Sequence, residues 1–269
     1  HAQMTPLPVL VFREEVAPGQ FVQTNDDLGF MRSHHFILGY DRKLGSDWRI
    51  KAETYYQLLT DVPVESTPTS YAVLNEGADF EFEEKGSLVN EGTGFNYGME
   101  LTLEKFFSRG YYGLLTTSLF NSRYEGSDGV ERNTAFNNNY VLNVLFGKEW
   151  KVGKEKRNAI TFDTKFATSG GRYYTPIDLQ ATRANAGREV LVEEEAYSLQ
   201  YDPYLRWDVK FGFRLNSKKK KISHQFFVDF QNVTNRNNIF VERYNEVTDR
   251  IDEVEQTGFF PDVLYRIQF

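Results

Sequence analysis

The sequence predicts an all-β protein: an antiparallel meander of about nine to ten long strands that belongs to a transmembrane β-barrel. Three observations predict this fold, namely strands with two different faces, a strict alternation of short and long connections, and a closing strand that ends in an aromatic residue. The 269 residues are 40% hydrophobic and 16% aromatic, with a mean hydropathy of -0.53. A barrel keeps a low mean hydropathy because only alternate strand residues face lipid. No run of about 18 apolar residues occurs, so a membrane-spanning helix is excluded within these residues.

The closing strand, residues 262–269, shows the alternation most clearly. Its apolar positions fall on one face and its polar positions on the other, and the last residue is a phenylalanine. An outer-membrane barrel has this pattern because lipid covers one side of its strands and a polar lumen lies on the other. We therefore expect the bacterial outer membrane as the location, and a closing strand that the barrel-assembly machinery reads as its signal. The expected signal residues are Val263, Tyr265, Ile267 and Phe269.

The strongest internal strand is predicted at 204–216, where apolar residues alternate with polar residues or glycine over about a dozen positions. A strand of this length crosses a bilayer at a tilt of about 45°. The same period of two predicts further strands, with weaker alternation in the fourth of them. These strands are expected at 36–41, 48–58, 97–104, 111–121, 142–147, 160–166 and 225–231.

The connections between these strands alternate between short and long. Short turns are expected at 44–47, 108–110, 153–157 and 217–221, and long polar segments at 61–94, 125–139, 170–203 and 235–258. Barrels of the outer membrane have short periplasmic turns and long extracellular loops. About nine strands that start on the extracellular side cannot close a bacterial barrel, and the sequence starts at His1 and shows no signal peptide. We therefore expect the chain to be the later part of a longer protein.

Charge and motif content argue against several other classes. The net charge of -7 argues against nucleic-acid binding, and Lys218 to Lys221 are interpreted as a solvated turn. The absence of cysteine excludes a disulfide scaffold and thiolate metal sites. His34 and His35 point to opposite faces of a strand, so they cannot chelate one metal ion together. No catalytic triad, phosphate loop or zinc pattern stands out, so neither an enzyme nor a cofactor is predicted.

Four segments, at 90–101, 170–178, 230–236 and 258–269, resemble the C-terminal barrel of a TonB-dependent outer-membrane receptor of the Bacteroidetes type. The resemblance implies a 22-stranded barrel with a plugged lumen. Residues 1–269 would be its C-terminal part, with the plug domain and the N-terminal strands absent. It also implies uptake of a scarce ligand, either a siderophore, a vitamin, a glycan or a peptide. The energy would come from a TonB complex that acts through the missing plug.

Inward-facing charges on two of the predicted strands are candidate lumen-lining residues. We interpret them as side chains that satisfy one another or hold a plug, and the ligand-binding residues are not predicted. Two alternative functions remain open: a plug-less porin-like or structural outer-membrane barrel, and a secreted β-sandwich that binds glycans. A sandwich would have to bury the apolar stripe of 205–215 against a second sheet. The candidate lumen-lining residues are Arg49, Lys51, Glu53, Arg206, Asp208, Lys210 and Arg214.

Overall fold

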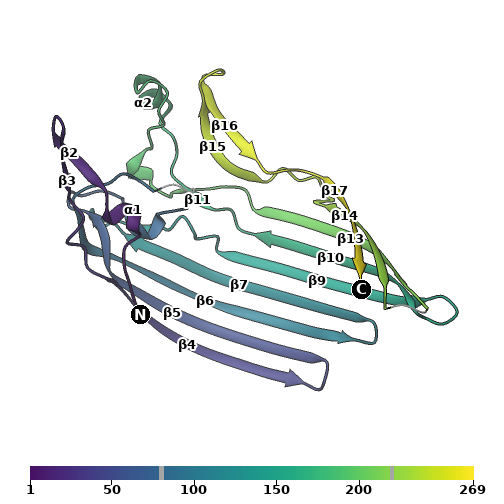
Figure 1. Ribbon diagram of the computed structural model, residues 1–269. Coiled ribbons are helices and arrows are strands. Elements are labelled where there is room, and N and C mark those ends of the chain that lie inside the picture. Colours follow the sequence, from purple (N-terminus) through teal and green to yellow (C-terminus); the bar gives the residue numbers. More distant parts are fainter. Residues whose placement is uncertain (79–81, 219–220) are drawn as a thin grey trace.

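A computed structural model describes residues 1–78, 82–218 and 221–269. The predicted all-β fold is confirmed: the chain forms one long antiparallel sheet in which neighbouring strands follow one another along the sequence (Figure 1). Two short strands, β1 (Ala2–Gln3) and β8 (Glu131–Asn133), add to β4 and β7. The nine long strands, in their order in the sheet, are β4 (Met31–Leu44), β5 (Trp48–Glu65), β6 (Leu88–Ser108), β7 (Tyr111–Glu125), β9 (Tyr140–Val152), β10 (Asn158–Ser169), β13 (Tyr204–Asn216), β14 (Ser223–Gln231) and β17 (Phe260–Gln268).

The parity of the connections is also confirmed. The short turns at 45–47, 109–110, 153–157 and 217–222 lie at one end of the sheet, and the long segments gather at the other end (Figure 1). The two-residue turn between β6 and β7, Arg109-Gly110, has φ values of 53° and 78°. Positive φ at both positions is the type I′ geometry that matches the twist of a hairpin, and glycine adopts it without steric cost. Lys219 and Lys220 of the predicted lysine turn lie outside the described residues.

Strands β5 and β6 are longer than the sequence suggested, so the expected loop at 61–94 shrinks to 66–87. The alternation fails there because the pairing of β5 with β6 is irregular around Val62 and Pro63. Val62 and Val64 are buried beneath the long segments, where they pack with Ala72 and Tyr124. A residue covered from outside need not obey the two-faced pattern of a half-buried strand.

Two other long segments, predicted as loops from their polar composition, contain short helices and strands. The expected loop at 170–203 holds β11 (Tyr173–Tyr174), α2 (Leu179–Ala184), η2 (Glu193–Glu195) and β12 (Leu199–Gln200). The expected loop at 235–258 holds the hairpin of β15 (Ile239–Asn245) and β16 (Arg250–Glu255), which rises from the sheet in Figure 1. The remaining elements are α1 (Leu7–Leu10), β2 (Arg13–Ala17), β3 (Gln20–Gln23) and η1 (Val73–Asn75). Among the described residues, none of the helices has the length and apolar character needed to cross a bilayer.

Strand register places the apolar side chains of neighbouring strands on one face, which we call the outer face. Phe162 pairs with Phe211, Phe211 with Val228, and Val228 with Val263. Large apolar side chains stay exposed on this face, up to 74% for Leu38 and for Val263. Soluble proteins rarely leave such a continuous apolar surface uncovered. Within the described residues no second sheet packs on it, so the alternative of a β-sandwich is wrong.

The closing strand keeps the predicted alternation. Val263, Tyr265 and Ile267 pair with outer-face residues of β14 and therefore share that face. Phe269 lies just past the end of β17 and is 88% exposed. Their role as an assembly signal stays a prediction.

Candidate functional site

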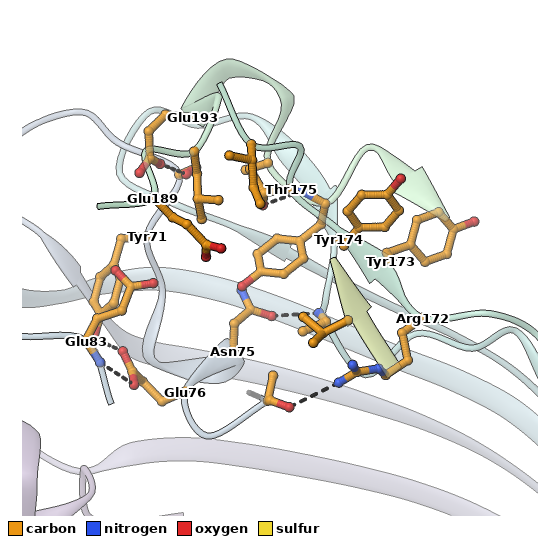
Figure 2. Close-up of a pocket in the computed structure, with 18 of the residues that line it drawn as sticks. Tyr71, Asn75, Glu76, Glu83, Arg172, Tyr173, Tyr174, Thr175, Glu189 and Glu193 are labelled. Carbon is orange, nitrogen blue, oxygen red and sulfur yellow. Dashed lines mark hydrogen bonds between the residues drawn. The ribbon is translucent and has the colours of Figure 1, made fainter. Parts of the chain in front are cut away.

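A pocket of about 610 Å³ lies among the long segments, at the end of the sheet opposite the short turns. Its walls come from the 66–87 segment, from the 170–203 segment and from strand β15, as Figure 2 shows. The buried clusters of the chain lie in the same region, beneath the long segments. The pocket is therefore walled by a packed assembly of loops on top of the sheet.

The 66–87 segment is fastened to its neighbours by polar contacts. The Ser70 hydroxyl donates to the Glu193 carboxylate at 2.6 Å, and the Arg172 guanidinium donates to the Ala78 carbonyl at 3.1 Å. On the other side, the Asn75 side-chain oxygen accepts from the backbone N–H of Ala135 at 2.9 Å. These bonds join three segments that are far apart in the sequence.

The β15–β16 hairpin is fastened to the 170–203 segment in the same way. Arg172 also donates to the Phe240 carbonyl at 2.6 Å, so one guanidinium bridges two segments across the pocket. The Tyr174 hydroxyl donates to the Glu242 carboxylate at 3.2 Å, and the Glu242 backbone N–H donates to the Tyr201 hydroxyl at 3.0 Å. Further from this centre, Glu189 pairs with Arg243 at 3.2 Å.

Stacked tyrosines form one wall of the pocket. The rings of Tyr174 and Tyr201 are nearly parallel, with centroids 4.0 Å apart. They come together because β11 and β12 pair, and this pairing begins where Gly171 meets the Tyr201 carbonyl. A Cβ on Gly171 would lie 1.8 Å from that oxygen, so the backbones approach each other only because glycine has no side chain. This is the physical reason for Gly171 in the 170–178 motif, and Gly170 approaches the Asn138 carbonyl in the same way, at 1.9 Å.

Carboxylates outnumber cations around the pocket. Burial and the hydrogen bond to Glu76 raise the pKa of Tyr71, and burial together with Glu242 raises the pKa of Tyr174 to about 12. Both phenols therefore stay neutral and donate to carboxylates at physiological pH. The described residues contain no group of three or more metal-ligating side chains. The acidic lining residues are Glu76, Glu83, Glu189, Glu193 and Glu242, and the basic ones are Lys85, Arg172 and Arg243.

The ion pair of Asp128 and Arg132 lies in a segment that contacts the 66–87 segment beside the pocket. The two guanidinium nitrogens of Arg132 donate to both oxygens of Asp128 at 2.9 and 2.7 Å. The segment that carries Asp128 holds the 66–87 segment, because the Ser127 hydroxyl accepts from the Thr69 backbone N–H at 3.0 Å. The hydrogen bond from Arg132 holds the pKa of Asp128 below its usual range.

We predict that this pair makes the stability of the protein fall in acid. A carboxyl group with a lowered folded-state pKa stabilises fully above the unfolded pKa of about 3.9, and the contribution is lost as the pH falls through the folded pKa. Asp128→Asn should cost about 1–3 kcal/mol at pH 7, because a mostly buried guanidinium loses its charged partner. The difference in urea unfolding between wild type and variant should hold from pH 7 to 5 and shrink below about pH 4. A pH-independent difference would contradict this assignment.

The segment 230–236 is a structural corner that carries the hairpin. Asn232 is 3% exposed and has a φ of 50°, and its amide donates to the Arg236 carbonyl at 2.9 Å. Its own backbone N–H donates to the Asp208 carboxylate at 2.8 Å. The side-chain oxygen of Asn232 accepts from the Thr234 hydroxyl at 3.0 Å. The corner thus fixes the direction in which the chain leaves β14 towards Glu242.

We predict that Asn232→Ala destabilises the protein by about 1–3 kcal/mol, because buried backbone groups lose their partner. The control Val247→Ala, at the 93% exposed tip of the hairpin, should change stability by less than about 0.5 kcal/mol. The rate of hydrogen exchange in the β15–β16 hairpin should rise in Asn232→Ala only. Equal protection of the hairpin in both variants would show that the corner does not position it.

The sequence-predicted charged residues share the opposite, inner face and none of them lines the pocket. Several pair with a neighbour: Arg49 donates to Asp41 at 2.9 Å, Arg206 to Asp208 at 2.8 Å, and Arg214 to Glu149 at 2.7 Å. Lys51 contacts Glu53, and Lys210 lies 4.7 Å from the ring centre of Phe227. That this face lines a lumen stays a prediction.

The pocket residues themselves were not predicted from the sequence. They come from segments without periodicity, although the 170–178 motif supplies several of them, among them Arg172, Tyr173 and Tyr174. The contacts that join these segments span sequence separations of 41 to 123 residues, as for Tyr201–Glu242 and Ser70–Glu193. Contacts between segments so far apart leave no short-range pattern in the sequence.

Comparison with known proteins supports the fold alone. No protein-family profile matches the chain, and no curated protein matches it in sequence. The chain is similar in structure to the outer membrane transporter YddB from Escherichia coli, with a TM-score of 0.56 and 13% sequence identity over 92% of the chain. It spans 34% of the length of that transporter. The chain therefore has the all-β fold of a segment of an outer-membrane barrel.

Proposed function

We propose that this chain is a barrel segment of an outer-membrane receptor that imports a small ligand. The observation that carries the proposal is the division of the sheet into two ends. One end has only tight turns, and the other carries a packed assembly of loops around a ligand-sized pocket. Binding pockets of small ligands have volumes of about 300–1,000 Å³, and this pocket falls in that range.

The two faces of the sheet support a location in the membrane. The outer face presents exposed apolar and aromatic side chains, and the inner face carries charges that pair with one another. Every backbone group of a strand in lipid needs a partner within the protein, and a closed barrel provides one. In this arrangement the long segments reach the cell exterior and the short turns the periplasm.

The pocket favours a neutral or cationic polar ligand over an anionic one. Its wall combines stacked tyrosine faces with an excess of carboxylates over cations. Ring faces pack against the apolar side of a ligand, and carboxylates accept hydrogen bonds from its hydroxyl or amino groups. A free phosphate or a polycarboxylate would meet repulsion here.

We further propose that uptake depends on a TonB complex acting through a plug domain held by the inner face. The support is the resemblance of four segments to TonB-dependent receptors and the similarity in fold to an outer membrane transporter. A porin-like barrel is the alternative, and its transport would not depend on TonB.

The test compares uptake by cells that express the full-length protein, the Tyr174→Ala variant, or the full-length protein without TonB. Cells grow in yeast-extract medium, and mass spectrometry records which compounds leave the medium. We expect at least one compound to be depleted by the wild type alone. Depletion that persists without TonB would favour the porin-like barrel, and recovery of the protein in the soluble fraction would refute the membrane location.

A further inference from the structure

A group of cations and aromatic rings lies on the outer face beside the short turns. At its centre is Tyr111, the first residue of β7, which pairs with Lys148 of β9. Lys148 in turn pairs with the outer-face residue Phe162. Its neighbours two positions away, Phe146 and Trp150, are exposed on the same apolar face. Lys148 is therefore a cation between apolar neighbours on the outer face.

The ammonium group of Lys148 is directed towards the short-turn end. It lies 5.2 Å from the ring centre of Tyr111 and 4.0 Å from the position that a Cβ would take on Gly110, in the β6–β7 turn. A lysine on a lipid-facing wall bends in this way to bring its charge to the interface, where the head groups begin.

Positive charge exceeds negative charge around this ring. Lys105 lies on the other side of the group, 4.6 Å from the ring centre of Tyr111, and its carboxylate neighbour is Asp47 at 3.7 Å. Arg109 is exposed on the turn itself. Within the described part of the chain, neither Arg109 nor Lys148 has a carboxylate at ion-pair distance. One acidic group therefore faces three cations.

We propose that Lys148 and Arg109 bind the phosphate of an anionic glycerophospholipid from the leaflet that the short turns face. The inference rests on the proposed membrane location. The acyl chains would lie along Phe146 and Val144, which follow Lys148 on the outer face in the direction away from the short turns. Trp150 lies on the short-turn side of Lys148, where its ring marks the depth of the interface. A cation beside an anionic lipid surface contributes about fivefold in affinity, and a zwitterionic head group with no net charge gains far less.

The experiment measures lipid retention by native mass spectrometry of the full-length protein in mild detergent. The probe is an equimolar mixture of phosphatidylglycerol and phosphatidylethanolamine. We expect wild type to retain phosphatidylglycerol preferentially, and Lys148→Gln and Arg109→Gln each to lower that retention about fivefold. The matched control is Lys165→Gln, an exposed lysine of β10 on the inner face, which should behave as wild type.

Heat-modified migration in gels shows that each variant is folded. Unchanged retention of phosphatidylglycerol in Lys148→Gln, or an equal loss in Lys165→Gln, would overturn the proposal. So would a preference for added lipid A over phosphatidylglycerol, because lipid A belongs to the other leaflet. If the wild-type protein imports its ligand but shows no preference for phosphatidylglycerol, this inference alone is refuted. If the full-length protein is recovered as a soluble protein, the proposed function is refuted.

Discussion

Replacing Val144 by arginine should destabilise the protein in lipid by about 2–4 kcal/mol, the cost of an arginine on the lipid face near the bilayer midplane. Val144 pairs with Leu115 on one side and Phe166 on the other, so its outer-face surroundings are apolar. A guanidinium there finds neither water nor a carboxylate. The measurement is urea unfolding of the full-length protein in phospholipid vesicles.

The matched control is the adjacent Asn143→Arg. Asn143 points to the opposite face, where it pairs with Thr116 and Ala167 and donates to the Thr116 hydroxyl at 3.4 Å. An arginine at this position meets a polar face, so stability should change by less than about 0.5 kcal/mol. Equal losses in the two variants would show that the outer face does not meet lipid.

Replacing Gly171 by valine should displace the pocket wall. The new Cβ would meet the Tyr201 carbonyl at 1.8 Å and a second backbone oxygen, that of Asp202, at 3.0 Å. Backbone atoms cannot move aside as the end of a flexible side chain can, so β11 and β12 must separate. We expect a destabilisation of about 1–3 kcal/mol or more, and loss of the Tyr174–Tyr201 stack.

Hydrogen exchange separates this local effect from general unfolding. Protection should fall in 170–203 and in the β15–β16 hairpin, while β9 and β10 keep theirs. Gly113→Val in β7 is the control, because the nearest atom would lie 3.6 Å from its Cβ, an ordinary contact, and its backbone is not in the left-handed region. Unchanged protection around Tyr174 in Gly171→Val would contradict the role assigned to this glycine.

The sheet was predictable because alternation is a local signal. The predicted strand at 204–216 has the observed bounds, and register carries the predicted outer face across the whole sheet. Prediction failed where that signal is absent. Val62 and Val64 are covered by the long segments, so this end of β5 lacks alternation and was predicted as a loop. The bulge between Ile239 and Val241 interrupts the alternation of β15, so the β15–β16 hairpin was not predicted.

The pocket was not predictable for a different reason. Ser70 and Glu193 meet only after the four strands β6, β7, β9 and β10 have paired, and Tyr174 and Glu242 only after β13 and β14 have paired. Their residue types are common in solvated loops, and nothing in their spacing marks them. The charges on the inner face were recognisable as a set, yet their partners Asp41 and Glu149 emerged only from the register.

Strands β5 and β6 are longer than a strand needs to be to cross a bilayer. A strand needs about 9–11 residues to cross a bilayer, whereas β5 has 18 and β6 has 21. At about 3.4 Å per residue and a tilt of about 45°, the surplus of β6 raises its far end about 25 Å above the hydrocarbon layer. In the proposed membrane location, the pocket therefore lies beyond the lipid head groups, at the far end of the two longest strands.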